Sequence, residues 1–247
     1  MEIKTSKIFG LRAVIEAINS ESSIDKIFIQ KDISGHLMNE LMTKIRTNNV
    51  AFSYVPVEKL DKLSKYGNHQ GAVAQIAPIN FHDLDTLVEA TLEKEETPLF
   101  LLLDQVSDVR NFGAIIRTAE CTGVHGIIIQ NQGNAPVNAE TVKTSAGAAF
   151  NIPICKVNHI KDALFVLQAA EIEIVAATEK TNDLLFDVDF KKPSAIIMGS
   201  EDRGINPSIL KMVNAKAKLP LKGNIGSLNV SVACGAFLYE AVRQRLS

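Results

Sequence analysis

The stretch Leu219-Pro-Leu-Lys-Gly-Asn-Ile-Gly-Ser-Leu-Asn-Val-Ser-Val-Ala233 is the most specific segment of this 247-residue chain. It begins at the end of an expected strand, and a loop over 223–226, bracketed by glycines, follows. Ser227 and Asn229 then precede an apolar helix over 230–245, and asparagine is a favoured N-cap residue. A capped, buried helix would account for the apolar pattern over 230–245 alone. It does not explain why a serine and an asparagine both stand before it, which favours a functional site.

Two further segments occupy the same kind of position. Asp104-Gln-Val-Ser-Asp-Val-Arg-Asn-Phe-Gly-Ala-Ile-Ile-Arg-Thr-Ala119 follows the apolar strand 99–103, and Ile197-Met-Gly-Ser-Glu-Asp-Arg-Gly204 lies at the end of another strand. In the latter, Gly199 and Gly204 permit a tight turn and a close approach of the backbone to a ligand. Ligands of open α/β sheets bind beyond the carboxyl ends of the strands. We therefore expect all three segments at one edge of a sheet.

The chain around these segments predicts an α/β fold. Continuous apolar strands alternate with helices over 98–247, a pattern typical of a parallel sheet covered on both faces. The expected strands are 99–103, 126–129, 152–155, 172–177, 195–198 and 217–221, and the expected helices are 113–122, 161–170, 207–213 and 230–245. A smaller α/β unit precedes them, with helices over 10–18 and 35–46 and strands over 25–29, 50–55 and 72–76.

The acidity of the chain is concentrated between these two regions. The formal net charge is −2, and six acidic residues against one basic residue lie in 81–97. Bounded by Pro78 and Pro98, this segment is interpreted as a charged, solvated helix or tether. The expected organisation is therefore a domain over 1–80, a linker over 81–97 and a domain over 98–247. The flanking regions are only slightly basic, so charge alone does not identify a nucleic-acid partner.

Composition excludes several classes of protein. No apolar run approaches the roughly 18 residues of a membrane span, and the polar N-terminus lacks the apolar core of a signal peptide. We therefore expect a cytoplasmic protein without a membrane partner. Cys121, Cys155 and Cys234 form no Cys-x-x-Cys pair and are interpreted as buried, reduced thiols. The five histidines show no ligand spacing with one another or with cysteine, so no metal site is predicted.

In their order along the chain, the three segments resemble the signature motifs of the SpoU/TrmH family of RNA ribose 2′-O-methyltransferases. The resemblance covers 98–247 and implies methyl transfer from S-adenosylmethionine to a ribose hydroxyl of RNA. It also implies a SPOUT fold, in which a parallel sheet carries a deep trefoil knot, and a homodimer with the active site near the subunit interface. Ile8-Phe-Gly-Leu-Arg-Ala-Val14 and Asn68-His-Gln-Gly-Ala-Val-Ala74 resemble the ribosomal-protein-like, substrate-binding domain of the same family.

The resemblance also implies roles for individual residues. The residues that it implies to be catalytic are Arg117, Asn111, Glu201, Ser227 and Asn229. The residues implied to bind S-adenosylmethionine are Thr178, Gly199, Ser200, Gly204, Leu219, Leu221, Ser227 and Leu228, and those implied to contact RNA are Arg110, His69 and Gln70.

The same residues also have plainer interpretations. Asn111 would be only a helix cap, and Arg117, near the first turn of that helix, a surface charge. Glu201 would orient Arg117 or Arg203, or be a solvated loop carboxylate. A guanidinium does not lose its proton in proteins, so a substrate phosphate pinned by Arg117 is the expected proton acceptor.

The expected substrate is ribosomal RNA, most specifically a guanosine ribose of 23S rRNA, because the N-terminal module is typical of that branch of the family. A transfer RNA enzyme of the same family and a non-catalytic RNA-binding homologue are the alternatives. An unrelated α/β nucleotide-binding enzyme would need phosphate-loop glycines of the Gly-x-Gly-x-x-Gly kind, which Met198-Gly-Ser-Glu-Asp-Arg-Gly204 lacks.

Overall fold

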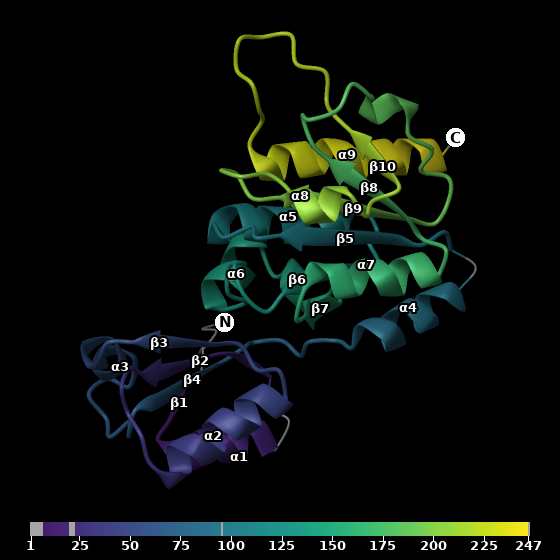
Figure 1. Cartoon of the computed structure of the whole chain (residues 1–247). Helices are drawn as coiled ribbons and strands as arrows, with labels where there is room; N and C mark the ends of the chain where they lie inside the picture. The colour runs from purple at the N-terminus through teal and green to yellow at the C-terminus, as the bar shows by residue number, and fades with distance from the viewer. Residues whose placement is uncertain (1–6, 20–22, 95, 247) are drawn as a thin grey trace. The chain divides into compact units, whose positions relative to one another are not determined.

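The structure is a computed structural model that describes residues 7–19, 23–94 and 96–246 (Figure 1). The chain divides into two compact units. The first comprises Met1–Asn80 and Pro136–Glu140, and the second comprises Phe81–Ala135 and Thr141–Ser247.

The first unit is built on a mixed four-stranded sheet in the order β1-β4-β2-β3. The strands are β1 (Lys7–Phe9), β2 (Ile24–Gln30), β3 (Phe52–Val55) and β4 (Ala72–Ile76), of which only β2 and β3 pair in parallel. Residues of α1 (Leu11–Asn19) and α2 (His36–Thr47) form one core with Ile27 and Ile29 of β2. A smaller cluster joins Phe28 to Leu60 of α3 (Val57–Leu63), so α3 packs on the opposite face of the sheet.

The second unit contains the parallel sheet that the sequence predicts. Its six strands lie in the order β10-β8-β9-β5-β6-β7, and every neighbouring pair is parallel. The strands are β5 (Leu99–Asp104), β6 (Gly126–Gln130), β7 (Ile154–Val157), β8 (Glu173–Ala177), β9 (Ser194–Gly199) and β10 (Ala215–Ala217). The central pair, β5 and β9, is buried along its whole length, which explains its continuous apolar sequence.

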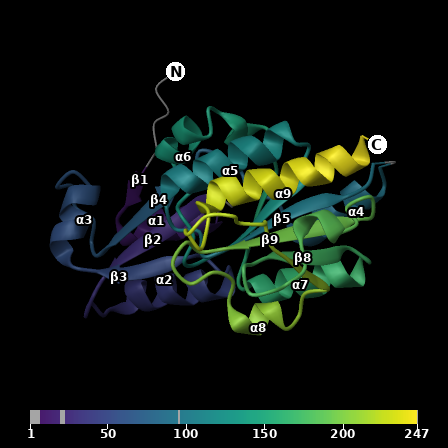
Figure 2. The same cartoon turned by 90° about the horizontal axis from the view of Figure 1, so that it is seen from above.

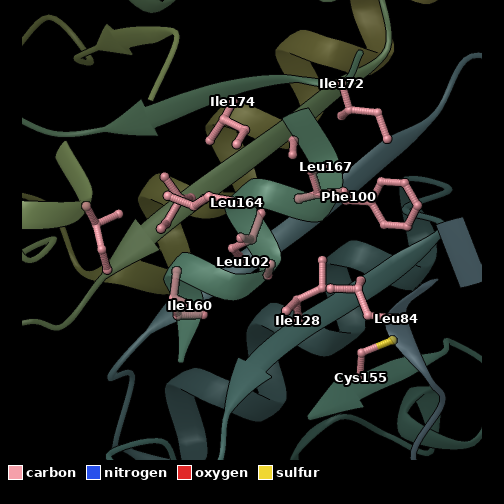
Figure 3. Packing of buried hydrophobic residues seen from close by; sticks show 14 of the residues in the cluster. Leu84, Phe100, Leu102, Ile128, Cys155, Ile160, Leu164, Leu167, Ile172 and Ile174 are labelled. Carbon is pink, nitrogen blue, oxygen red and sulfur yellow. The ribbon is translucent and has the colours of Figure 1, made fainter. Parts of the chain in front are cut away.

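Helices cover both faces of this sheet. On one side, α4 (Leu84–Leu92), α7 (Ile160–Ala169) and α8 (Pro207–Leu210) form the core shown in Figure 3, in which Leu164 of α7 and Leu102 of β5 participate. On the other side, α5 (Val109–Cys121) and α9 (Val230–Arg245) run side by side (Figure 2). The short helices η1 (Ala148–Phe150) and η2 (Leu185–Asp187) belong to this unit, and α6 (Ala139–Thr144) begins in the segment assigned to the first unit and ends in the second.

The acidic segment is a helix, α4, but it is not a solvated linker. Asp83 caps it by accepting the Thr86 N–H at 2.9 Å, and this hydrogen bond lowers the pKa of the Asp83 carboxyl. Leu84 and Val88 on its apolar face are buried in the core with α7. Its acidic side chains lie on the opposite, exposed face, which is why composition alone suggested a tether.

The details of the sequence prediction that were wrong include the bounds of several elements and the exposure of one cysteine; the helix expected over 207–213 ends at Leu210, and the strand expected over 152–155 is Ile154–Val157. The helix expected over 113–122 begins at Val109, and its N-cap is Asp108 rather than Asn111. The strand expected over 217–221 ends at Ala217, and Pro220, which has no N–H to donate, lies in the loop that follows. Cys121 is exposed, whereas Cys155 and Cys234 are buried. Burial raises the pKa of both buried thiols to about 12.

Arg245 fastens the end of α9 to the rest of the second unit. Its guanidinium donates to the carbonyl oxygens of Thr97 at 2.6 Å and of Pro98 and Phe190 at 2.9 Å. Replacing it with methionine leaves these partly buried carbonyls without their charged donor. We expect Arg245→Met to lower the free energy of unfolding by about 2–3 kcal/mol in urea denaturation.

The matched control for this prediction is the neighbouring arginine. Arg243 bonds Glu240 alone among the described residues, and its side chain is 65% exposed. Arg243→Met should therefore lower the free energy of unfolding much less than Arg245→Met does. Equal losses in the two variants would show that the carbonyl contacts of Arg245 contribute nothing beyond a surface ion pair.

Candidate active site

A pocket of about 740 Å³ lies at the carboxyl ends of β8 and β9, bounded by the loop between β10 and α9. This volume falls within the usual range for small-molecule sites. All eight residues that the sequence assigned to a cofactor line it: Thr178, Gly199, Ser200, Gly204, Leu219, Leu221, Ser227 and Leu228. Glu201 and Asn229 line it as well, whereas Asn111, Arg117 and Arg110 do not. The residues of the second and third segments therefore share one cavity.

The floor of the pocket depends on a tight turn after β9. A Cβ atom on Gly199 would overlap the backbone of Gly204 and Ile205, so only glycine fits there. The turn is closed by the Gly204 N–H, which donates to the Ser200 carbonyl at 2.9 Å. Gly204 itself has φ +68°, a left-handed conformation that favours glycine. The glycines of this segment are thus required by the path of the backbone.

A chain of hydrogen bonds joins the three segments. Asn229 caps α9, and its Oδ1 accepts the Ser231 N–H at 2.9 Å, which leaves its amide group as a donor. That group donates to Oδ1 of Asn111 at 3.0 Å, and Nδ2 of Asn111 donates to Oε1 of Glu201 at 2.6 Å. We call these three residues the Asn–Asn–Glu chain. Because the cap of α9 uses Oδ1 of Asn229 as its acceptor, the donor and the acceptor of each hydrogen bond in the Asn–Asn–Glu chain are determined.

Glu201 therefore has a different partner from the one expected. Its carboxylate accepts from the Asn111 amide, and within the described residues no ion pair joins it to Arg117 or Arg203. The amide of Asn111 is committed to this chain, while the helix cap that Asn111 was expected to form is made by Asp108. The physical reason is that both are cap-type residues, but only Asp108 precedes the first helical residue.

Arg117 lies in the third turn of α5, not near the first turn as expected. Arg110 and Arg117 are seven residues apart, which places them on one face of the helix, about 10 Å apart along its axis. Both are exposed, and neither forms an ion pair with a described carboxylate. Two unpaired guanidinium groups on one helix face are suited to bind phosphate.

Asp104, at the end of β5, holds the backbone beside the pocket, a role that sequence reasoning did not assign to it. It is buried, and its Oδ2 accepts the Asn206 N–H at 2.8 Å, just beyond the turn that carries Glu201. Burial raises the pKa of this carboxyl, and the hydrogen bond from Asn206 opposes the rise. The sequence signal was available, because an acidic residue ends an otherwise apolar strand. Glu179 and Lys180, which follow Thr178 into the pocket lining, were also missed.

In the first unit, the two residues expected to contact RNA hold the backbone together. His69 is buried: its Nε2 lies 3.2 Å from Oδ1 of Asp61, and its Nδ1 accepts the Gly71 N–H at 3.0 Å. Oε1 of Gln70 accepts the Leu11 N–H at 3.2 Å, although its side chain is exposed. Both ring nitrogens of His69 are therefore engaged inside the unit.

No helix within 7–19, 23–94 or 96–246 is long and apolar enough to cross a bilayer. Among the same residues, no group of three or more His, Cys, Asp and Glu side chains is arranged to hold a metal ion.

Comparison with known families identifies the two units. The model of the SpoU rRNA Methylase family matches residues 98–239, and the model described as RNA 2′-O ribose methyltransferase substrate binding matches residues 7–82. The chain belongs to the SpoU rRNA methylase family. Its enzyme class is that of the RNA 2′-O-ribose methyltransferases, and its second unit has their SPOUT fold.

Full-length relatives are found among curated proteins and solved structures. The putative TrmH family tRNA/rRNA methyltransferase YacO of Bacillus subtilis is 32% identical over 238 residues, covering 96% of this chain and 95% of that protein. The 23S rRNA (guanosine-2′-O-)-methyltransferase RlmB of Photobacterium profundum is 34% identical over 243 residues, covering 96% and 97%. The AdoMet-bound rRNA methyltransferase from Sinorhizobium meliloti superposes with a TM-score of 0.63 at 27% identity, covering 100% of this chain and 90% of that one.

The role of the Asn–Asn–Glu chain can be tested by replacing Asn229. Asn229→Asp keeps an oxygen that can cap α9, since Asp and Asn cap equally well, but it removes the donor to Asn111 and adds a negative charge. We expect kcat for methyl transfer to fall by about 10- to 100-fold while the thermal midpoint barely changes. Steady-state kinetics and calorimetry on the same preparation would measure both. An unchanged kcat would mean that the Asn–Asn–Glu chain has no part in catalysis.

Proposed function

We propose that this methyltransferase acts on a ribose 2′-OH of large-subunit ribosomal RNA, most specifically of a guanosine in 23S rRNA. The observation that carries the chemical part of the proposal is the Asn–Asn–Glu chain, which brings all three sequence segments to the mouth of one pocket. The substrate part rests on full-length similarity to RlmB and on the match of residues 7–82 to a substrate-binding domain.

The pocket fits S-adenosylmethionine. Its size is suitable, the tight turn at Gly199 forms its floor, and the side chains of Leu219, Leu221 and Leu228 offer an apolar surface for a purine ring. Thr178 and Glu179 supply polar groups for the ribose hydroxyls of S-adenosylmethionine and for the charged end of its methionine part. When bound, S-adenosylmethionine supplies a methyl group that its sulfonium centre already activates. The protein therefore has to orient the ribose oxygen and provide an acceptor for its proton, which can be a group of the RNA that the protein holds in place.

Alignment is the larger contribution that the protein makes. Positioning of reactants can supply about 7–11 kcal/mol, whereas general-base help is typically worth 10²–10⁴-fold. We assign the positioning to the Asn–Asn–Glu chain together with Ser227, which lines the pocket beside Asn229. Arg117 binds a phosphate of the RNA bidentately, and that phosphate accepts the proton of the hydroxyl. Arg117 also stabilises the negative charge that develops on the ribose oxygen.

Transfer of radiolabelled methyl from S-adenosylmethionine to RNA from a deletion strain tests the proposal. Label on a ribose of 23S rRNA, mapped by nuclease digestion, is the expected result. Label on transfer RNA alone would keep the chemistry and overturn the assignment of the substrate. Absence of label on either RNA, with S-adenosylmethionine still bound, would favour a non-catalytic RNA-binding protein.

We also propose that the enzyme is a cytoplasmic homodimer. Cytoplasmic placement follows from the proposed ribosomal RNA substrate. The dimer is supported by an exposed apolar stripe along α9 and its C-cap, in which Val232 and Tyr239 are each 57% exposed and the C-cap residue Leu246 is 85% exposed. These residues are spaced by seven, so they lie on one face of the helix. Light scattering should give twice the mass of 26.9 kDa, and a monomeric mass would overturn the dimer.

A further inference from the structure

The loop over residues 64–71 in the first unit presents a single aromatic side chain to solvent. Tyr66 is 79% exposed. Its φ is +62°, and that of Lys65 is +54°. Bulky residues rarely adopt this left-handed conformation, and where one does, the position is a candidate for function. We call residues 64–71 the Tyr66 loop.

The unusual backbone is held in place from several sides. The Tyr66 N–H donates to the Asp61 carbonyl at 2.7 Å, and the Ser64 hydroxyl donates to the Gly67 carbonyl at 3.1 Å. His69 ties the far end of the loop to the Asp61 carboxylate. A Cβ on Gly67 would lie 2.7 Å from Cε2 of Phe9, so the ring of Phe9 packs directly on this glycine. The loop is therefore a built structure that holds Tyr66 outward.

Lysines and side-chain amides surround Tyr66, together with the carboxylate of Asp61, which His69 contacts. Lys62 and Lys65 are exposed, and neither forms an ion pair with a described carboxylate. Beside them, a hollow of about 380 Å³ is lined by Gln30, Asn68 and Gln70, among others. The Asn68 side chain forms no hydrogen bond with any described residue. An exposed ring, unpaired lysines and amides that can read base edges are the combination with which proteins hold unpaired nucleotides.

We propose that the Tyr66 loop contacts RNA: Tyr66 stacks on an unpaired base, Lys62 and Lys65 bind the adjoining phosphates, and Asn68 and Gln70 contact base edges from the hollow. This inference rests on the proposed function, because it takes RNA as the substrate, and it names the surface that holds it. The expected contact residue is thus Tyr66 rather than the buried His69.

The test compares Tyr66→Asn with Tyr54→Asn. Asparagine tolerates a positive φ, so Tyr66→Asn should fold at least as well as the parent. Tyr54 is the matched control, a tyrosine of the same unit that is 57% exposed on β3. With an unmodified 23S rRNA transcript as the probe, we expect Tyr66→Asn to weaken binding by about 5- to 100-fold. Tyr66→Phe and Tyr54→Asn should bind like the parent.

Two further measurements separate stacking and charge. A blunt RNA duplex offers no unpaired base, so parent and Tyr66→Asn should bind it equally. Replacing Lys62 and Lys65 with glutamine should reduce the slope of log affinity against log salt by about 0.7 per lysine. In methyl-transfer assays, Tyr66→Asn should raise KM for RNA and leave the affinity for S-adenosylmethionine unchanged.

Failure of this inference is distinguishable from failure of the proposed function. Equal affinity of the parent and Tyr66→Asn for the 23S transcript, with methyl transfer by the parent intact, would overturn the role of the Tyr66 loop alone. Loss of affinity in Tyr54→Asn to the same degree would also overturn it, since the effect would not be specific to the loop. Absence of methyl transfer by the parent on any RNA would instead overturn the proposed function.

Discussion

Arg117→Ala is expected to lower kcat for methyl transfer by about 10²- to 10³-fold while S-adenosylmethionine binds with its normal affinity. The reason is that Arg117 is exposed and unpaired among the described residues and does not line the cofactor pocket, so its removal leaves the pocket intact. A guanidinium that pins a phosphate and stabilises a developing oxyanion acts mainly in the transition state. Single-turnover kinetics with saturating RNA, together with calorimetric titration of the cofactor, would measure both quantities.

Arg110 supplies the matched control for that experiment. It lies on the same face of α5, seven residues earlier, and is also exposed. If it binds a neighbouring phosphate without reaching the reacting oxygen, Arg110→Ala should raise KM for RNA and leave kcat close to normal. Arg117→Lys should remain strongly impaired, because lysine lacks the planar fork of donors. Near-normal turnover by Arg117→Lys would contradict the assignment.

Gly199→Ala should lower the affinity for S-adenosylmethionine by about 100-fold or more. The added Cβ would overlap the backbone of Gly204 and Ile205, so the turn that carries Ser200 and Glu201 has to move. A displacement of about 1 Å in a positioning element can cost 10²-fold. Overpacking should also lower the free energy of unfolding by about 1–3 kcal/mol. Cofactor titration and urea denaturation would measure the two effects.

Gly223→Ala is the matched control for the turn. Gly223 lies in the exposed loop between β10 and α9, and a Cβ atom there meets nothing within 4 Å. The variant should therefore bind the cofactor as the parent does. If Gly199→Ala also bound normally, the turn after β9 would not form part of the cofactor site.

The parallel sheet could be predicted from the sequence because its strands are buried on both faces and read as unbroken apolar runs. The bounds of β10 could not, because the hydrophobic pattern over 217–221 continues past the last backbone pair, which Pro220 cannot extend. The place of α4 could not be predicted from the sequence either. A helix with one buried face and one acidic face has the composition of a linker, and only packing of Leu84 and Val88 reveals its place.

At the candidate site, residue types were predictable and their partners were not. The Asn–Asn–Glu chain joins residues that are 90 and 118 positions apart, and no local pattern records such a pairing. Asp108 and Asn111 both suit a helix cap, and the choice between them depends on which residue is the first of the helix, which residue types alone do not determine. The deep knot stays a prediction from the resemblance.

The contacts of Arg245 have a consequence for how the second unit folds. The longest of them joins residues 148 positions apart, because Arg245 ends α9 while Thr97 lies two residues before β5. A domain dominated by such non-local contacts has a high contact order, so it should fold slowly and without a stable early half. Arg245 links the end of α9 to the segment that leads into β5, so we expect the two elements to open together. Amide hydrogens of β5 and α9 should then exchange with the same protection, as one cooperative block.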